Sequence, residues 1–438
     1  MRAPIWPLAA TAVAALACAG GDPPPEPVSA QREWRTHGGD PGHTQHSPLS
    51  HIDTGNVSRL RVAWTYRTGD ARAEGRSQIQ CNPIVVDGVL YATTARVETV
   101  ALDAATGREI WRFNPHEAGA EAQSGGLAVN RGVVYWRDGE DRRILVTAGQ
   151  HLFALDARTG RPAPGFGQHG SVDLREGLGR DAADLFVVST TPGAVYRDLL
   201  ILGSRVHEGP GPSAPGHVRA YDVRTGVIRW TFRTIPQPGE YGHDTWPEDA
   251  WRHVGGANAW SGISVDHERG LVFLPTGSPA FDFWGGDRHG ANLFGNCLLV
   301  LKAATGERVW HFQTVHHDVW DYDLPSQPGL YQVWRDDELH DVVAQVAKSG
   351  LGFVLDRDTG QPVLPVEERP TPQAGVPGEF LSPTQPFPVT TPPIVPNQLR
   401  SNDAFGITLW DKLACVSRLR SLRKEGLFTP PSTEGTLQ

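Results

Sequence analysis

The chain has 438 residues, of which 39% are hydrophobic and 20% charged, a composition typical of a globular protein that buries a substantial core. Its 49 glycines and 36 prolines stay below the level typical of disordered chains. The net charge is −9, and the single basic cluster (Arg418, Arg420, Arg423 and Lys424) indicates a solvated surface, so we expect no nucleic-acid partner.

Residues 1–19 are typical of an export signal. Arg2 supplies a positive charge, and the apolar stretch Leu8–Ala19 is too short to span a bilayer as a mature helix. The residues around Cys18 fit both a small-residue cleavage site and a lipobox in which Cys18 would carry a lipid. We expect residues 20–32 to form a polar, flexible tether. Both endings predict an exported, periplasmic protein, in one case a membrane-anchored lipoprotein.

The cysteines exclude several cofactor classes. Cys18, Cys81, Cys297 and Cys415 contain no CxxC pair, so a zinc ribbon, a thioredoxin motif and a CxxCH haem attachment are all excluded. Apart from Cys18, these residues can be free core thiols or include one disulfide, and their spacing leaves both possibilities open.

A short phrase recurs along the chain: an apolar residue, Asp, two residues and Thr-Gly, often followed by Trp. Its five copies, one with Lys in place of Asp, lie 53 to 80 residues apart. They are Leu102–Gly107 with Trp111, Leu155–Gly160, Tyr221–Gly226 with Trp230, Leu301–Gly306 with Trp310, and Leu355–Gly360.

The chemistry of the phrase predicts a β-hairpin. Its Asp and Thr side chains can satisfy the turn amides, its Gly can adopt a positive φ, and its Trp begins the return strand. Runs such as Pro83–Tyr91 precede the phrase and indicate further strand–turn–strand units. The repetition therefore predicts an all-β protein, a β-propeller of four-stranded blades.

The chain changes character toward its C-terminal end. Residues 361–400 contain eleven prolines, which a regular blade cannot hold, so we expect an ordered wrap or long loop there. Residues 401–438 contain no complete copy of the phrase. We therefore expect one propeller domain over residues 33–438.

The repeated phrase with its Trp resembles the tryptophan-docking motif of the eight-bladed quinoproteins, the pyrroloquinoline quinone (PQQ) dehydrogenases. The resemblance covers Glu33 to Gln438. Trp310–Pro325 (WHFQTVHHDVWDYDLP) and Thr276–Arg288 are similar to the glucose-type enzymes, whereas Val129–Trp136 is similar to the alcohol-type enzymes. Relatives continue well past the position that matches Gln438, so the resemblance implies a C-terminally truncated propeller that lacks its last blades.

The resemblance implies a set of site residues. Asp321 matches the catalytic Asp of the His-Asp-x-Trp-Asp run, where a carboxylate beside a cation acts as general base. Lys348 matches the cation that contacts the reactive quinone oxygens. The implied cofactor-binding residues are Trp260 as the stacking floor, Arg131 as the partner of a cofactor carboxylate, and Thr190 and Gln80 around the ring, with Gln80 where many relatives carry Glu.

The resemblance also implies a metal site. Glu208 matches a calcium-ligating carboxylate, and Ser278 stands where alcohol-type enzymes carry a ligating Asn. Asp321 and Asp323 complete the set, and Asp323 matches the extra carboxylate of lanthanide-using relatives. Hard oxygen ligands favour Ca²⁺, which we rank above a lanthanide. For His316 and His317 we expect orienting or packing roles.

These features favour PQQ-dependent oxidation of the CH–OH group of an alcohol or aldose. Without a haem motif, the electrons would pass to membrane quinone or to a separate cytochrome c. Two alternatives stay open: a non-enzymatic envelope propeller, acting as a scaffold lipoprotein or an inactive truncated relic, and a sugar-binding propeller that has lost its quinone. The co-occurrence of Arg131, Glu208, Trp260, Asp321 and Lys348 favours the enzyme lineage.

Overall fold

The computed structural model describes residues 33–40, 42–72, 77–120, 129–396 and 399–437. The predicted export signal (1–19), with Cys18, and the tether (20–32) lie outside the described residues. Cys81, Cys297 and Cys415 are all unpaired. None of the described helices is both long and apolar enough to cross a membrane.

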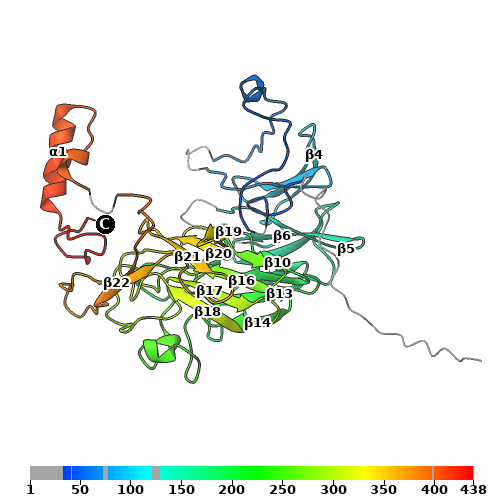
Figure 1. The fold of residues 1–438 in the computed structure, drawn as a ribbon. Helices are drawn as coiled ribbons and strands as arrows, with labels where there is room; N and C mark the ends of the chain where they lie inside the picture. Colours follow the sequence, from blue (N-terminus) through cyan, green and yellow to red (C-terminus); the bar gives the residue numbers. More distant parts are fainter. Residues whose placement is uncertain (1–32, 41, 73–76, 121–128, 397–398, 438) are drawn as a thin grey trace, which may run out of the picture.

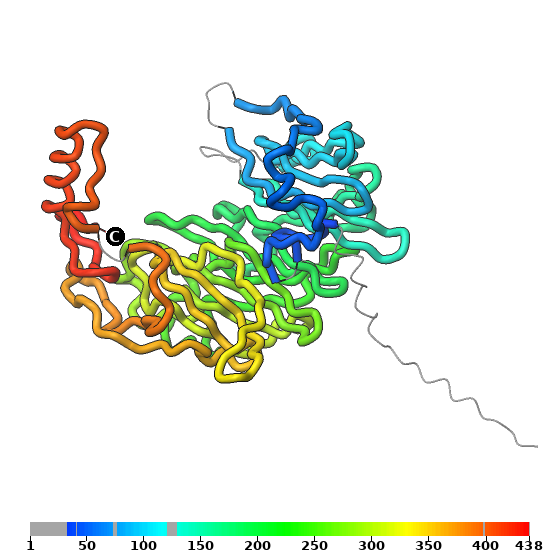
Figure 2. The backbone as a smooth tube through the Cα atoms, turned by 45° about the horizontal axis from the view of Figure 1, so that its top comes forward, coloured from blue at the N-terminus to red at the C-terminus, as the bar shows by residue number. Residues whose placement is uncertain are grey.

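Antiparallel sheets dominate the described part of the chain and confirm the predicted propeller of four-stranded blades. Four of these sheets have four strands each, in the orders β1-β2-β3-β4, β5-β6-β7-β8, β10-β11-β13-β14 and β15-β16-β17-β18. A three-stranded sheet, β19-β20-β21, follows them. Figure 2 shows the sheets succeeding one another in chain order, from blue through green to yellow.

The bounds of the strands are as follows. The first two sheets hold β1 (Ile84–Val86), β2 (Val89–Thr93), β3 (Thr99–Asp103), β4 (Glu109–Phe113), β5 (Val134–Asp138), β6 (Asp141–Ala148), β7 (His151–Asp156) and β8 (Ser171–Asp173). The next two hold β10 (Ala194–Tyr196), β11 (Leu199–Leu202), β13 (Val218–Asp222), β14 (Ile228–Phe232), β15 (Ser264–Asp266), β16 (Leu271–Pro275), β17 (Cys297–Lys302) and β18 (Arg308–Gln313). The remaining strands are β19 (Gly329–Arg335), β20 (Glu338–Val346), β21 (Gly352–Asp356), and the short pair β9 (Val187–Val188) and β12 (Arg205–Val206).

The recurring Asp-x-x-Thr-Gly phrase forms the predicted turn. After β3, the Asp103 carboxylate accepts hydrogen bonds from the backbone N–H of Thr106 (2.9 Å) and from its hydroxyl (2.8 Å). Gly107 follows with a φ of +71°, which favours glycine. The same two hydrogen bonds recur at Asp156, Asp222 and Asp356.

The Trp of the phrase docks onto the turn of the next sheet. The indole N–H of Trp111 donates to the carbonyl of Ala157 (3.0 Å), and its ring covers Gly160, where an added Cβ would lie 2.5 Å from the ring. The same contact joins Trp64 to Gly107, Trp230 to Gly306, and Trp310 to Gly360. The tryptophans therefore connect successive sheets, which explains why the phrase combines Thr-Gly with Trp.

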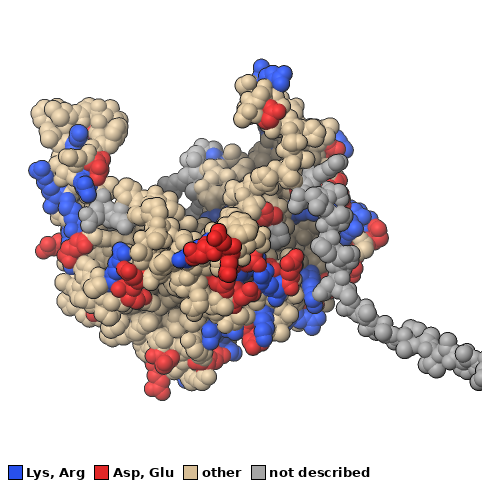
Figure 3. Space-filling model, in the orientation of Figure 1, with Lys and Arg blue, Asp and Glu red and all other residues tan. Residues whose placement is uncertain are grey.

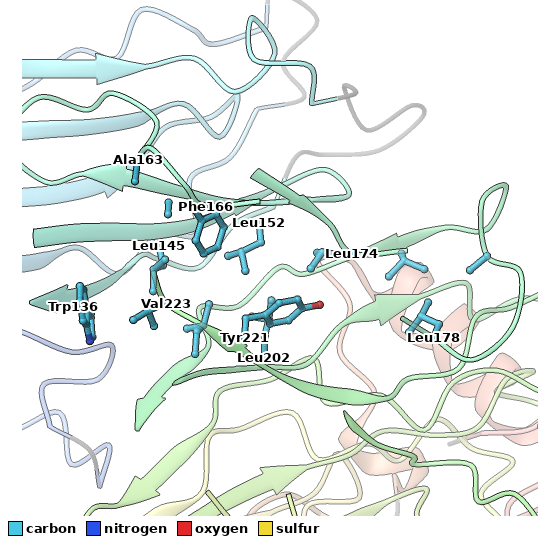
Figure 4. Packing of buried hydrophobic residues seen from close by; sticks show 14 of the residues in the cluster. Trp136, Leu145, Leu152, Ala163, Phe166, Leu174, Leu178, Leu202, Tyr221 and Val223 are labelled. Carbon is cyan, nitrogen blue, oxygen red and sulfur yellow. The ribbon is translucent and has the colours of Figure 1, made fainter. Parts of the chain in front are cut away.

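The largest cores lie between neighbouring sheets. Between the second and third sheets, Phe166 and Leu152 face Tyr221 and Leu202, and all four are at most 2% exposed (Figure 4). Full burial of each such side chain contributes about 1.5–3 kcal/mol. Because each core couples two sheets, the loops at the sheet ends are held in fixed relative positions.

Among the described residues of the Pro-rich segment 361–400, β22 (Val366–Pro370) and β23 (Thr384–Pro388) form a hairpin, and the others are irregular. The sequence reasoning did not predict the helix α1 (Leu409–Ser421), which stands apart from the sheets in Figure 1. Its Thr408 cap accepts from the Asp411 N–H (3.2 Å), while the Asp411 carboxylate accepts from the Thr408 N–H (3.0 Å). Short 3₁₀ turns lie at Val57–Arg59, His243–Thr245, Ala250–Arg252 and Ser401–Asp403.

The predicted basic cluster lies on and after α1. Arg418, Arg420 and Lys424 are exposed, and Arg423 pairs with Glu425 at 2.6 Å. Lys and Arg side chains gather on the lower part of this projecting arm (Figure 3). The cluster is therefore a solvated surface, as expected from the sequence.

Candidate functional site

The loop between β18 and β19 carries the predicted general base. Asp321 adopts a left-handed backbone conformation, with a φ of +59°. The Lys348 ammonium group, from the turn between β20 and β21, donates to the Asp321 carboxylate (2.6 Å) and to that of Asp323 (2.9 Å). The structure thus brings the two predicted catalytic residues into direct contact across 27 positions of sequence.

The charges of this pair are set by their surroundings. Burial and the negative charge of Asp323 raise the pKa of Asp321 to about 7. Burial lowers the pKa of Lys348, but the carboxylates of Asp323 and Asp321 overcome this effect and raise it to about 12. Lys348 therefore stays charged, while Asp321 titrates near neutral pH, where a general base works best.

Trp260 lies beside this pair. Its indole N–H donates to the Asp323 carboxylate (2.9 Å), which fixes the ring. The Arg131 guanidinium and the Lys348 ammonium group each lie 5.5 Å from its ring centroid. An aromatic face next to two cations suits a planar, anionic ring system, so these residues fit the PQQ that the resemblance implies.

Polar side chains surround Arg131. Its guanidinium donates to the hydroxyls of Thr190 (2.7 Å) and Thr191 (3.3 Å). Burial and the nearby charge of Arg205 lower the pKa of Arg131. Two guanidinium groups in one region suit a ligand with several carboxylates. Gln80 is exposed, and no hydrogen bond between described residues joins it to this group.

The glycine pair before Trp260, Gly255 and Gly256, lies against other parts of the chain. An added Cβ at Gly255 would meet Ser213 at 2.3 Å, and one at Gly256 would meet the Ala280 nitrogen at 2.4 Å. The pair therefore makes room for the protein's own chain.

Acidic groups gather on one side of the site. Glu208 pairs with Arg205 (3.3 Å), and the backbone N–H of Asp282 donates to the Glu208 carbonyl (3.3 Å). Burial and the negative charges of Asp321, Asp323 and Glu208 raise the pKa of Asp282 to about 8. This excess of negative oxygen atoms fits a hard cation chemically.

The acidic side chains of the site do not form a coordination shell in this structure. No three His, Cys, Asp or Glu side chains among the described residues converge on one point. The Ser278 hydroxyl donates to Asp318. The Asp323 carboxylate accepts from the Ser278 N–H (2.6 Å), Trp260 and Lys348. A cation would have to draw Glu208 and the Asp321 carboxylate toward it.

The two histidines of the loop both have hydrogen-bond partners. His316 contacts the side chains of Gln313 (2.7 Å) and Glu368 (3.1 Å). The buried His317 contacts the Gly290 carbonyl (2.8 Å) and Glu379 (3.3 Å). These contacts fit the orienting and packing roles expected for them.

Sequence reasoning missed Arg205, Asp282 and Asp318. Arg205 lies in the short strand β12 and Asp282 on the loop between β16 and β17. Only the assembled sheets bring them to the site, and no local pattern marks them. Asp318 did carry a signal, because it is the first acid of the His-Asp-x-Trp-Asp run.

Residues 34–438 match the family model of the PQQ-dependent glucose/ethanol/alcohol dehydrogenase β-propeller domain. The chain is 34% identical to quinoprotein glucose dehydrogenase A of Acinetobacter calcoaceticus over 94% of this chain and 54% of that protein. It is 35% identical to the glycerol dehydrogenase large subunit of Gluconobacter oxydans over 92% and 56% of the respective chains.

The solved structure of a quinohemoprotein alcohol dehydrogenase from Pseudomonas putida HK5 superimposes with a TM-score of 0.64 at 30% identity, covering 79% of this chain and 50% of that one. The chain thus spans about half the length of the curated relatives it matches. By its repeats, its fold and these similarities, the chain belongs to the PQQ-dependent glucose/ethanol/alcohol dehydrogenase β-propeller family.

Proposed function

We propose that this chain holds PQQ against Trp260 and oxidises the CH–OH group of an alcohol or aldose. The supporting observation is the convergence of Arg131 and Lys348 at 5.5 Å from the Trp260 ring, with Asp321 bonded to Lys348. The names of the relatives, a glucose and a glycerol dehydrogenase, support polyols and aldoses as the substrate class.

Each residue has a role in this proposal. Asp321 accepts the proton of the substrate hydroxyl as general base. Lys348 keeps its positive charge and donates hydrogen bonds to oxygen atoms that gain negative charge. Arg131, supported by Thr190, pairs with a carboxylate of the cofactor. PQQ, when bound, supplies the two-electron acceptor.

The metal and the electron route are further parts of the proposal. Glu208, Ser278, Asp321 and Asp323 would surround Ca²⁺, with a lanthanide as the less favoured ion, and the crowded acid Asp282 would join them. Electrons would leave to membrane quinone or to a cytochrome c. The protein would be exported to the periplasm, with a lipid anchor at Cys18 as one possibility.

The test is reconstitution of the purified protein with PQQ and Ca²⁺, followed by dye reduction with alcohols, glycerol and aldoses. We expect turnover by the wild type and a loss of at least about 100-fold in Asp321→Asn, because positioned bases typically contribute 10²–10⁴-fold. Asp138→Asn, at an acid outside the site that pairs with Arg224, is the matched control and should keep full activity. A folded protein that binds PQQ but oxidises none of these substrates would refute the proposal.

A further inference from the structure

The loop that carries Asp321 is organised around a second acid, Asp318. This carboxylate is only 1% exposed. One of its oxygens accepts from the backbone N–H of Trp320 (2.9 Å), and the other accepts from the backbone N–H of Tyr322 (2.8 Å). Asp321 lies between these two amides. The side chain of Asp318 therefore closes the backbone around the proposed base.

The same carboxylate attaches the loop to the preceding sheet. The amide group of Asn296, immediately before β17, donates to it (2.8 Å), and so does the hydroxyl of Ser278, which follows β16. The fully buried Arg288 donates to the carbonyl of Asp318 (2.6 Å) and to the side chain of Asn292 (2.9 Å). The loop is thereby held through side chain and backbone at one residue.

The conformation held in this way is one that Asp321 would not adopt freely. A φ of +59° is uncommon for a residue with a Cβ, because the left-handed conformation brings the Cβ close to the following carbonyl oxygen. Four donors on one buried carboxylate can compensate the cost of this conformation, because hydrogen bonds to a charged group are stronger than those between neutral groups. The strain is located at the residue whose carboxylate contacts Lys348.

We infer that Asp318 is a positioning residue: it holds the Asp321 carboxylate in reach of substrate and Lys348 without touching either. The expected effect of Asp318 on turnover rests on the proposed function. The expected effect of Asp318 on the loop conformation does not. Trp260 and Arg131 do not bond to Asp318, so quinone binding should survive its replacement.

The experiment compares Asp318→Asn with the wild type in three measurements: backbone hydrogen exchange of a peptide covering residues 318–323, PQQ affinity by tryptophan quenching, and dye-reduction kinetics. We expect at least tenfold faster exchange at the Trp320 and Tyr322 amides, PQQ affinity within about threefold, and kcat at least tenfold lower with KM little changed. Asp266→Asn is the matched control, since Asp266 is also buried and accepts from two backbone amides, those of Glu268 and Arg269, at a turn outside the site.

A second variant keeps the test decisive if Asp318→Asn does not fold. Asn296→Gly removes one donor to Asp318 and tolerates the φ of +51° at that position. It should produce the same pattern with a smaller amplitude. Unchanged exchange and unchanged kcat in the folded variants would overturn the inference, as would equal losses of PQQ affinity and kcat. If the wild type shows no turnover, the proposed function fails, and the exchange data alone decide whether Asp318 holds the loop.

Discussion

The contact between Trp111 and Gly160 allows a quantitative test of how successive sheets are joined. At Gly160 the φ is +69°, and an added Cβ would lie 2.5 Å from the Trp111 ring. Gly160→Ala therefore combines two costs: about 1–2 kcal/mol for the left-handed backbone and about 1–3 kcal/mol for overpacking against the indole. We expect the free energy of unfolding to fall by about 2–5 kcal/mol.

Gly88 provides the matched control. It has a φ of +77°, but an added Cβ would meet no atom within 4 Å. Gly88→Ala should therefore cost only the backbone term of about 1–2 kcal/mol. Urea denaturation followed by tryptophan fluorescence measures both variants. Overpacking requires Gly160→Ala to lose about 1–3 kcal/mol more free energy of unfolding than Gly88→Ala. If the two losses agree within about 0.5 kcal/mol, the docking contact does not couple the sheets.

Three further predictions concern other parts of the molecule. Burial lowers the pKa of His217 to about 3, and its ring nitrogen accepts a hydrogen bond from the Thr234 N–H (3.3 Å). Between pH 6.5 and 3 the imidazole is therefore protonated only in the unfolded chain. The free energy of unfolding therefore falls with pH, by about 2 kcal/mol at pH 5. Urea denaturation should show that His217→Asn removes this loss, and an unchanged pH dependence in the variant would show that His217 does not cause it. Thr408→Ala should weaken α1 by about 1 kcal/mol, visible as faster hydrogen exchange confined to that helix, and unchanged exchange would show that the cap is unimportant. Ca²⁺ should raise the thermal midpoint of the PQQ-free protein and a chelator should reverse the rise, whereas Glu208→Gln should reduce the shift; an equal shift in that variant would exclude Glu208 as a ligand.

Local chemistry explains how much of the fold could be predicted from the sequence. The Asp-x-x-Thr-Gly phrase contains both partners of its own turn, as the bonds between Asp103 and Thr106 show, so no tertiary knowledge was needed. Helix α1 was missed although Thr408 and Asp411 form a capping pair, because its apolar residues lack a clear helical period. The part of the fold that could be predicted is thus the part whose hydrogen-bond partners lie within a few residues of one another.

The site likewise contains residues that a sequence motif identifies and residues that only the tertiary structure brings together. Asp321, Lys348, Trp260 and Arg131 could be located through a family resemblance, and the structure brings them together. The acid Asp282 could not be found, because its surroundings depend on loops distant in sequence.

Whether the chain holds PQQ against Trp260 is tested by titrating the purified protein with PQQ in the presence of Ca²⁺ and monitoring tryptophan quenching. We expect one PQQ per chain, at least tenfold weaker binding in Trp260→Ala, and unchanged binding in Trp410→Ala, where the replaced indole is 78% exposed on α1. A folded wild-type protein that binds no PQQ, or a Trp260→Ala variant that binds it equally well, would show that PQQ is not held against Trp260.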